Sequence, residues 1–179
     1  MKKSTRVSGG PRKTGERRGG GQQGVRSQKG PRVAVRTRPP KDPTACDKCG
    51  AVYTRKQWRS RARLTRPLLE KVAWGVCPAC DQTRRGIGYG RVILDGPFVL
   101  EHRAAIEQRI GNVVARARHT QTQRRLVSVE TTHRGLDVIT TSQKLAHRLA
   151  RELEKAFGGR TRYSWADDDG SLRATWTRR

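Results

Sequence analysis

Two Cys-x-x-Cys pairs constrain the fold of this chain more than any other feature of its sequence. The first pair is Cys46 and Cys49, the second is Cys77 and Cys80, and the 179 residues contain no further cysteine. Each pair brings two thiolates to one side of a tight turn, and two such turns supply the four sulfurs that tetrahedral Zn²⁺ requires. We therefore predict one Zn²⁺ ion held by all four cysteines. Redox-active dithiols or incidental cysteines are the alternative.

A four-sulfur shell is closed, so it leaves no position for a reactive water, and the predicted zinc is structural. The two pairs are separated by 27 residues, which exceeds the common spacing of about 15–20 and predicts an inserted helix or hairpin. We expect a zinc-ribbon-like module over residues 45–90. The basic N-terminus lacks the apolar segment of a secretion signal, and no run of about 18 apolar residues is present. These features predict a cytoplasmic protein with no membrane span.

The charge of the chain is strongly unbalanced, with 40 Lys and Arg residues against 15 Asp and Glu and a formal net charge of +25. Residues 1–44 hold thirteen of these basic residues and two acidic ones, between glycines and prolines and with few apolar side chains. So little apolar surface cannot offset the conformational entropy lost on folding. We predict a disordered basic tail here, and a polyanion such as nucleic acid as the partner.

Residues 91–179 carry the periodic apolar patterns of a folded α+β domain. The predicted order is a strand at 91–95, a helix at 98–118, strands at 127–131 and 136–140, a helix from 141 or 142 to 157, and strands at 161–165 and 172–176. The order β-α-β-β-α-β with one more strand resembles a split βαβ, ferredoxin-like sheet with two helices on one face.

The last two predicted strands contain aromatic and basic side chains on alternate positions. Tyr163, Trp165 and Trp176 are in phase with Leu172, so we predict that they belong to the core and do not stack on bases. The opposite face presents Arg160, Arg162 and Arg173, either as solvated strand residues or as nucleic-acid contacts.

Basic residues are also numerous in the predicted zinc module. Four thiolates on one Zn²⁺ carry a net charge of −2, which nearby cations are expected to offset; those close in sequence are Lys48, Arg55, Lys56, Arg84 and Arg85. The surplus predicts an RNA surface, whose candidate residues are Arg55, Lys56, Arg59, Arg61, Arg63, Arg66, Arg84 and Arg85. Trp58 and Trp74 in the same segment either stack on bases or pack around the zinc.

Motifs of catalysis are lacking. The sequence has no phosphate-binding loop, no G-x-S-x-G elbow and no H-E-x-x-H pair. Three consecutive carboxylates, at 167–169, have the chemistry to bind Mg²⁺ in a nuclease, but their position before Gly170 between two strands favours a hairpin turn. We predict a protein that is not an enzyme.

Several segments in this order resemble the nonsense-mediated decay protein 3 family. They are the two cysteine pairs followed by residues 89–94, 96–103, 106–112, 135–138, 145–150 and 163–175. In eukaryotes this family is the adaptor that binds the large ribosomal subunit and accompanies its nuclear export. The resemblance implies binding to ribosomal RNA or the ribosome through the zinc module. The larger members have more cysteines, long C-terminal domains and transport signals, so we expect a short prokaryotic branch and do not carry over nuclear export.

Together these features predict a zinc-containing, non-enzymatic RNA-binding protein associated with the large ribosomal subunit or its RNA, in assembly or in quality control. A zinc-ribbon DNA-binding transcriptional regulator is the alternative, and it would prefer duplex DNA and act as a dimer.

Overall fold

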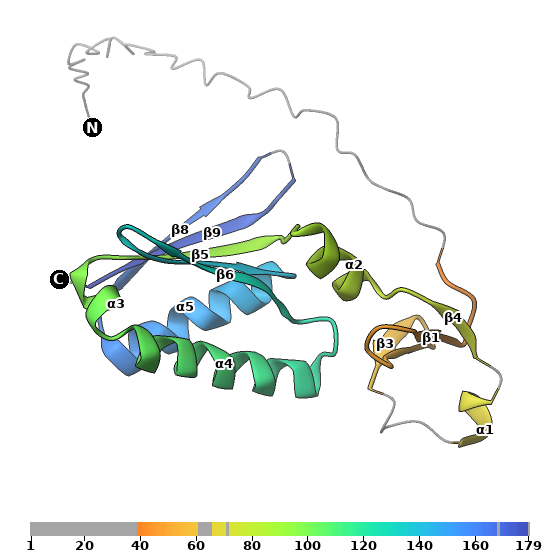
Figure 1. The fold of residues 1–179 in the computed structure, drawn as a ribbon. Helices are drawn as coiled ribbons and strands as arrows, with labels where there is room; N and C mark the ends of the chain where they lie inside the picture. Colours follow the sequence, from red (N-terminus) through yellow and green to blue (C-terminus); the bar gives the residue numbers. More distant parts are fainter. Residues whose placement is uncertain (1–38, 61–65, 71, 168, 179) are drawn as a thin grey trace, which may run out of the picture.

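The computed structural model describes residues 39–60, 66–70, 72–167 and 169–178. Most of the predicted basic tail lies outside these described residues. The described chain forms a four-stranded sheet and a five-stranded sheet, each containing parallel and antiparallel pairs, together with helices (Figure 1). The predicted α+β fold class is therefore confirmed. In the described part of the chain, no helix combines the length and apolar character needed to cross a bilayer.

The small sheet contains the first cysteine pair and leads directly to the second. Its strands are β1 (Thr44–Cys46), β2 (Val52–Thr54), β3 (Gln57–Arg59) and β4 (Ala73–Gly75), in the order β3-β2-β1-β4. The β2–β3 hairpin and the short helix α1 (Arg66–Leu69) occupy the segment between the pairs. Because β4 runs parallel to β1 with Gly75 opposite Cys46, the chain that leaves β4 delivers Cys77 beside the first pair.

The large sheet has the order β6-β7-β5-β9-β8. Its strands are β5 (Gly90–Asp95), β6 (Leu126–Thr132), β7 (Gly135–Thr140), β8 (Arg160–Trp165) and β9 (Leu172–Thr177). Helices α4 (Arg103–Thr120) and α5 (Gln143–Phe157) lie on one face (Figure 1). Strand β7 lies antiparallel between β5 and β6, as in the predicted split βαβ unit. The core fills the space between this face and the two helices.

The extra strand of the predicted order occupies an inner position. A ferredoxin-like sheet would place the strand after the second helix beside β5, but here β9 pairs with β5 in parallel and β8 lies at the edge. The reason is the composition of the two strands. Leu172, Ala174 and Trp176 of β9 are buried, whereas most of β8 is exposed, so the apolar strand is the one enclosed by neighbours.

The helix predicted over 98–118 is interrupted at His102. Helix α3 (Pro97–Glu101) precedes this residue and α4 follows it, and the His102 backbone has φ −108° and ψ 21°, outside the helical region. The two segments pack against different elements, since α3 contacts β7 and α4 contacts α5. Because the chain changes direction at His102, α3 can pack against β7 while α4 packs against α5.

Helix α5 begins and ends where the sequence predicts. The side-chain oxygen of Ser142 accepts a hydrogen bond from the backbone N–H of Leu145 and caps the first turn. Gly158 ends the helix with φ 72°, a conformation that glycine adopts readily. The buried stripe includes Leu145, Leu149 and Leu153 at the predicted i, i+4 spacing.

The prediction for the aromatic residues is correct for Trp176 and wrong for the other two. Trp176 is buried, but Tyr163 is 38% exposed and Trp165 is 59% exposed. Both belong to the edge strand β8, where α5 provides only partial cover: the His147 ring lies 4.9 Å from the Tyr163 ring. Alternation along the strand correctly predicted which face they share but not how far the helix layer extends.

The sheet face opposite the helices carries charged side chains. Arg160, Arg162 and Arg173 are exposed there, and they share the face with Arg91, which pairs with the buried carboxylate of Asp137.

Candidate metal centre and nucleic-acid surface

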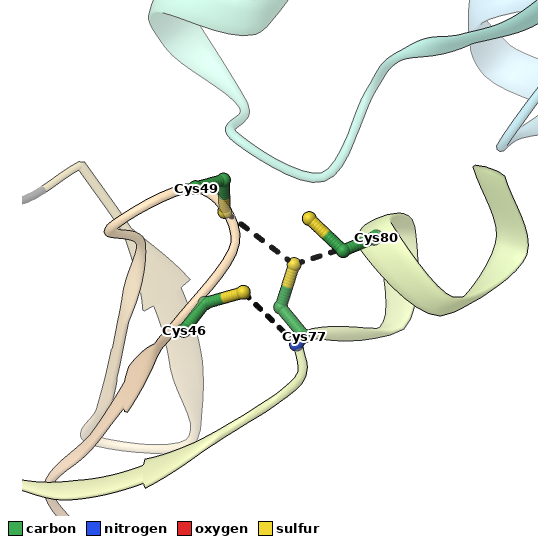
Figure 2. Close-up of side chains that lie close together, drawn as sticks. All are labelled: Cys46, Cys49, Cys77 and Cys80. Atoms are coloured by element: carbon green, nitrogen blue, oxygen red, sulfur yellow. Dashed lines mark hydrogen bonds between the residues drawn. The ribbon is translucent and has the colours of Figure 1, made fainter. Parts of the chain in front are cut away.

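The four cysteines converge on one point between the small sheet and helix α2 (Pro78–Arg85). Figure 2 shows Cys46 and Cys49 from the turn after β1 facing Cys77 and Cys80 from the start of α2. The backbone N–H of Gly50 donates to the Cys46 carbonyl at 2.9 Å and closes this turn. Gly50 has φ +69°, which a residue with a side chain rarely adopts. The local backbone therefore brings both pairs into one group.

The geometry of the sulfurs fits a zinc ion. All four Sγ atoms lie within 4.8 Å of one another, and those of Cys49 and Cys77 are 3.7 Å apart. A tetrahedron with Zn–S distances near 2.3 Å places its sulfurs about 3.8 Å apart. Backbone N–H groups also point at the sulfurs, because Cys77 N donates to Cys46 Sγ at 3.3 Å and Cys80 N to Cys77 Sγ at 3.4 Å. Such donors stabilise thiolates, which are the form that binds metal.

The thiols do not ionise equally. Burial raises the pKa of Cys77 above its ordinary value. At Cys80, burial together with the neighbouring thiols of Cys77 and Cys49 raises the pKa to about 12. At Cys49 burial acts in the same direction, but the hydrogen bonds from Arg125 and the backbone N–H of Ala51 outweigh it and lower the pKa to about 7. Of these three, Cys49 is the first to supply a thiolate near neutral pH.

Among the described residues, the side chain of Arg125 donates hydrogen bonds to the sulfurs; this residue precedes β6, and the sequence did not single it out. Its Nη2 donates to Cys49 Sγ at 2.9 Å and its Nη1 to Cys80 Sγ at 3.2 Å. Its Nε donates to the carbonyl of Thr122 at 2.9 Å, which fixes the plane of the guanidinium. One arginine fork thus contacts one sulfur from each cysteine pair.

The sequence predicted other cations for this role, and that expectation needs correction. Arg84 and Arg85 pair with Asp81, at 2.8 and 3.4 Å, and Lys48 pairs with Asp47 at 3.5 Å. These side chains are close to the cysteines in sequence but are directed to carboxylates of their own segments. No sequence signal identified Arg125, because 76 residues separate it from Cys49.

A second contact joins the same loop to the metal centre. The side-chain oxygen of Gln123 accepts a hydrogen bond from the backbone N–H of Ala79 at 3.0 Å. Ala79 lies in the first turn of α2, between the two cysteines of the second pair. Gln123 and Arg125 therefore tie the α4–β6 connection of the large sheet to the cysteine cluster.

The candidate RNA contacts occupy separate elements. Arg55 and Lys56 form the tip of the β2–β3 hairpin, with φ of 49° and 62°, and Arg59 ends β3. Arg66 begins α1. Arg84 and Arg85 lie in the last turn of α2. Arg61 and Arg63 lie outside the described residues.

The two tryptophans of this segment, Trp58 and Trp74, differ in whether they pack around the cysteines or remain accessible for stacking on bases. Trp58 is partly buried against the cysteine cluster, and its ring centre lies 5.5 Å from that of Tyr53. Trp74 is 68% exposed. Trp58 thus packs around the metal centre, and Trp74 has an accessible ring.

The acidic segment at 167–169 shows turn chemistry. The Asp169 carboxylate accepts a hydrogen bond from the backbone N–H of Ser171 at 2.7 Å, and Gly170 has φ +68°. Asp168 lies outside the described residues. Within the described ranges, the one group of three or more side chains suited to a metal ion is the set of four cysteines.

These features define a class of protein with a four-cysteine module hydrogen-bonded to an α+β domain that has two helices on one face of its sheet. Residues 99–167, from α3 through β8, match the family model described as NMD3, second domain. This match confirms the resemblance to the nonsense-mediated decay protein 3 family over that part of the chain; the cysteine module lies outside the match. Comparisons with curated proteins and with solved structures gave no match.

Proposed function

We propose that this protein is a non-enzymatic factor that binds ribosomal RNA on the large ribosomal subunit or its precursors. The observation that carries the proposal is the match of residues 99–167 to the second domain of NMD3, because that family is the large-subunit adaptor in eukaryotes. The net charge of +25 supports a polyanionic partner. Nuclear export is not part of the proposal.

Zinc has a structural role in this proposal. Cys46, Cys49, Cys77 and Cys80 would hold one Zn²⁺, which supplies a crosslink between the small sheet and α2 and no reactive position. Arg125 contributes positive charge beside four thiolates whose summed charge exceeds that of the ion. Because Arg125 belongs to the large-sheet domain, the crosslink also fixes where the cysteine module sits on that domain.

The RNA surface that we propose centres on the cysteine module. Arg55 and Lys56 project from the hairpin tip and Arg59 follows on β3. Arginine suits this role because its planar fork contacts phosphate oxygens in pairs and stacks on bases. Arg66, Arg84 and Arg85, with Arg61 and Arg63, complete the proposed set.

Sedimentation tests the proposal in its native context. Tagged protein in a native lysate should co-sediment with large ribosomal subunits, and crosslink mapping should place residues of the hairpin on ribosomal RNA. Because phosphate contacts release counterions, log K for purified ribosomal RNA should fall with log salt by about 0.7–0.9 per phosphate neutralised. Protein found only in ribosome-free fractions, with affinity indifferent to salt, would contradict the proposal. A preference for duplex DNA over ribosomal RNA would favour the DNA-binding regulator instead.

A further inference from the structure

A cleft lies beside the metal centre, between α2, α4 and the start of β6. Its volume is about 520 Å³. The apolar side chains that line it are Val76, Val114 and Leu126, and its basic side chains include Lys48, Arg84 and Arg118. The cleft therefore combines an apolar lining with cationic groups.

We propose that this cleft receives one unpaired nucleobase of a bound RNA strand, an inference that rests on the proposed RNA-binding function. A base presents apolar faces, which the valines and the leucine can remove from water, while each neighbouring phosphate carries a negative charge. Lys48, Arg84 and Arg118 supply the complementary charge. The volume lies in the range of pockets that enclose small ligands, about 300–1,000 Å³.

The basic residues of the cleft differ in how far they are already neutralised. Arg84 and Lys48 contact Asp81 and Asp47. Arg118, in the last turn of α4, has no ion-pair partner in the part of the chain that the structure describes. Arg118 is therefore the cation most available for phosphate.

The metal centre forms one wall of the cleft. Cys80 and Arg125 line it, and the same Arg125 guanidinium donates to two cysteine sulfurs. Val76 directly precedes Cys77, so its position depends on the cysteine cluster. The cleft requires a base that has left its stack, which predicts preference for single-stranded RNA over a duplex.

A steric variant tests the occupancy of the cleft. Val76 is 47% exposed, so Val76→Trp should fill the space without disturbing the core. Ile87→Trp is the matched control, because Ile87 is 44% exposed, β-branched and outside the cleft. The probe is a fluorescein-labelled single-stranded RNA of about 12 nucleotides, a length that one small binding domain covers. We expect Val76→Trp to weaken binding by the zinc-loaded full chain about tenfold and Ile87→Trp to leave it unchanged, with equal zinc content.

A charge variant tests the phosphate contact separately. Arg118→Gln should weaken the same RNA and reduce the salt slope by about one phosphate. Arg116→Gln removes an equal charge two residues earlier on the same helix, about 200° around its axis and outside the cleft, and should have a smaller effect. Equal losses in the two variants would mean that only net charge matters, and would overturn the assignment of the cleft.

The outcomes separate this inference from the proposed function. If Val76→Trp binds like wild type while Arg55→Ala with Arg59→Ala binds weakly, the base site is wrong and the RNA function stands. If the wild-type chain ignores RNA altogether, the proposed function fails first. If an acidic leucine-containing peptide binds in a Val76-dependent manner and RNA does not, the cleft is a protein site and the RNA assignment is overturned.

Discussion

Removing the Arg125 side chain should weaken zinc binding although Arg125 is not a ligand. Its guanidinium donates to Cys49 and Cys80 at 2.9 and 3.2 Å, and both bonds strengthen when the sulfurs are negatively charged. Loss of an outer partner of a metal ligand costs about 10- to 100-fold in affinity, which equals about 1.4–2.8 kcal/mol. Because Arg125→Ala removes two hydrogen-bond donors to the sulfurs, we expect its loss of zinc affinity to lie in the upper part of this range.

Chelator competition under matched buffer conditions measures the effect. Arg124→Ala is the control, because Arg124 is adjacent and equally charged but contacts no sulfur among the described residues. Arg125→Lys should fall between the two, since it keeps the charge and loses the fork. Indistinguishable zinc affinities for Arg125→Ala and Arg124→Ala would refute the reasoning.

The pH of zinc release provides a second measurement of the same effect. Protons compete with zinc for thiolates, so zinc is lost as the pH falls. Arg125 helps to lower the pKa of Cys49 to about 7. Without Arg125 this pKa rises, protons compete more strongly at each pH, and the midpoint of zinc release should move to higher pH. A midpoint that stays fixed or moves to lower pH would contradict the role of Arg125.

Three further predictions concern stability. Cys46→Ser should release zinc and unfold the small sheet while the large-sheet spectrum persists, as metal analysis and NMR would show. Trp176→Ala should lower the free energy of unfolding by about 3–5 kcal/mol, whereas the exposed Trp165→Ala should change it by about 0.5 kcal/mol or less; denaturant titration measures both. By the same assay, Gly135→Ala should destabilise the fold, because the φ of Gly135 is +154° and the new methyl group would collide with a backbone oxygen of β5. Gly111 lies on α4 with open space around its added methyl group, so Gly111→Ala should stabilise the fold by about 0.5–1 kcal/mol.

Features governed by local sequence could be predicted. The close approach of the two cysteines within each Cys-x-x-Cys pair follows from their short spacing, and α5 follows from its cap, its leucine spacing and its terminal glycine. The hairpin of β8 and β9 follows from alternation on both sides of an acidic turn. In each case the residues that determine the structure lie within a few positions of one another, so the pattern is visible in the chain.

Features that depend on distant contacts could not be predicted in this way. Arg125 reaches Cys49 across 76 residues, and nothing near Arg125 marks it as different from Arg124. The exposure of Trp165 depends on β8 occupying the sheet edge, which is a property of strand order. The cleft beside Cys80 requires α2, α4 and β6 to meet, so no single segment encodes it.

The outer place of β8 has a consequence for self-association. If the sheet ended at the apolar strand β9, its free backbone groups would offer a template for another chain. Strand β8 covers that border and presents Arg160 and Arg162 along it, and charged side chains on a sheet border oppose pairing with a second molecule. Like charges on two approaching copies repel each other. We therefore expect Arg160 and Arg162 to disfavour the pairing of β8 strands from two molecules into an intermolecular sheet at high protein concentration.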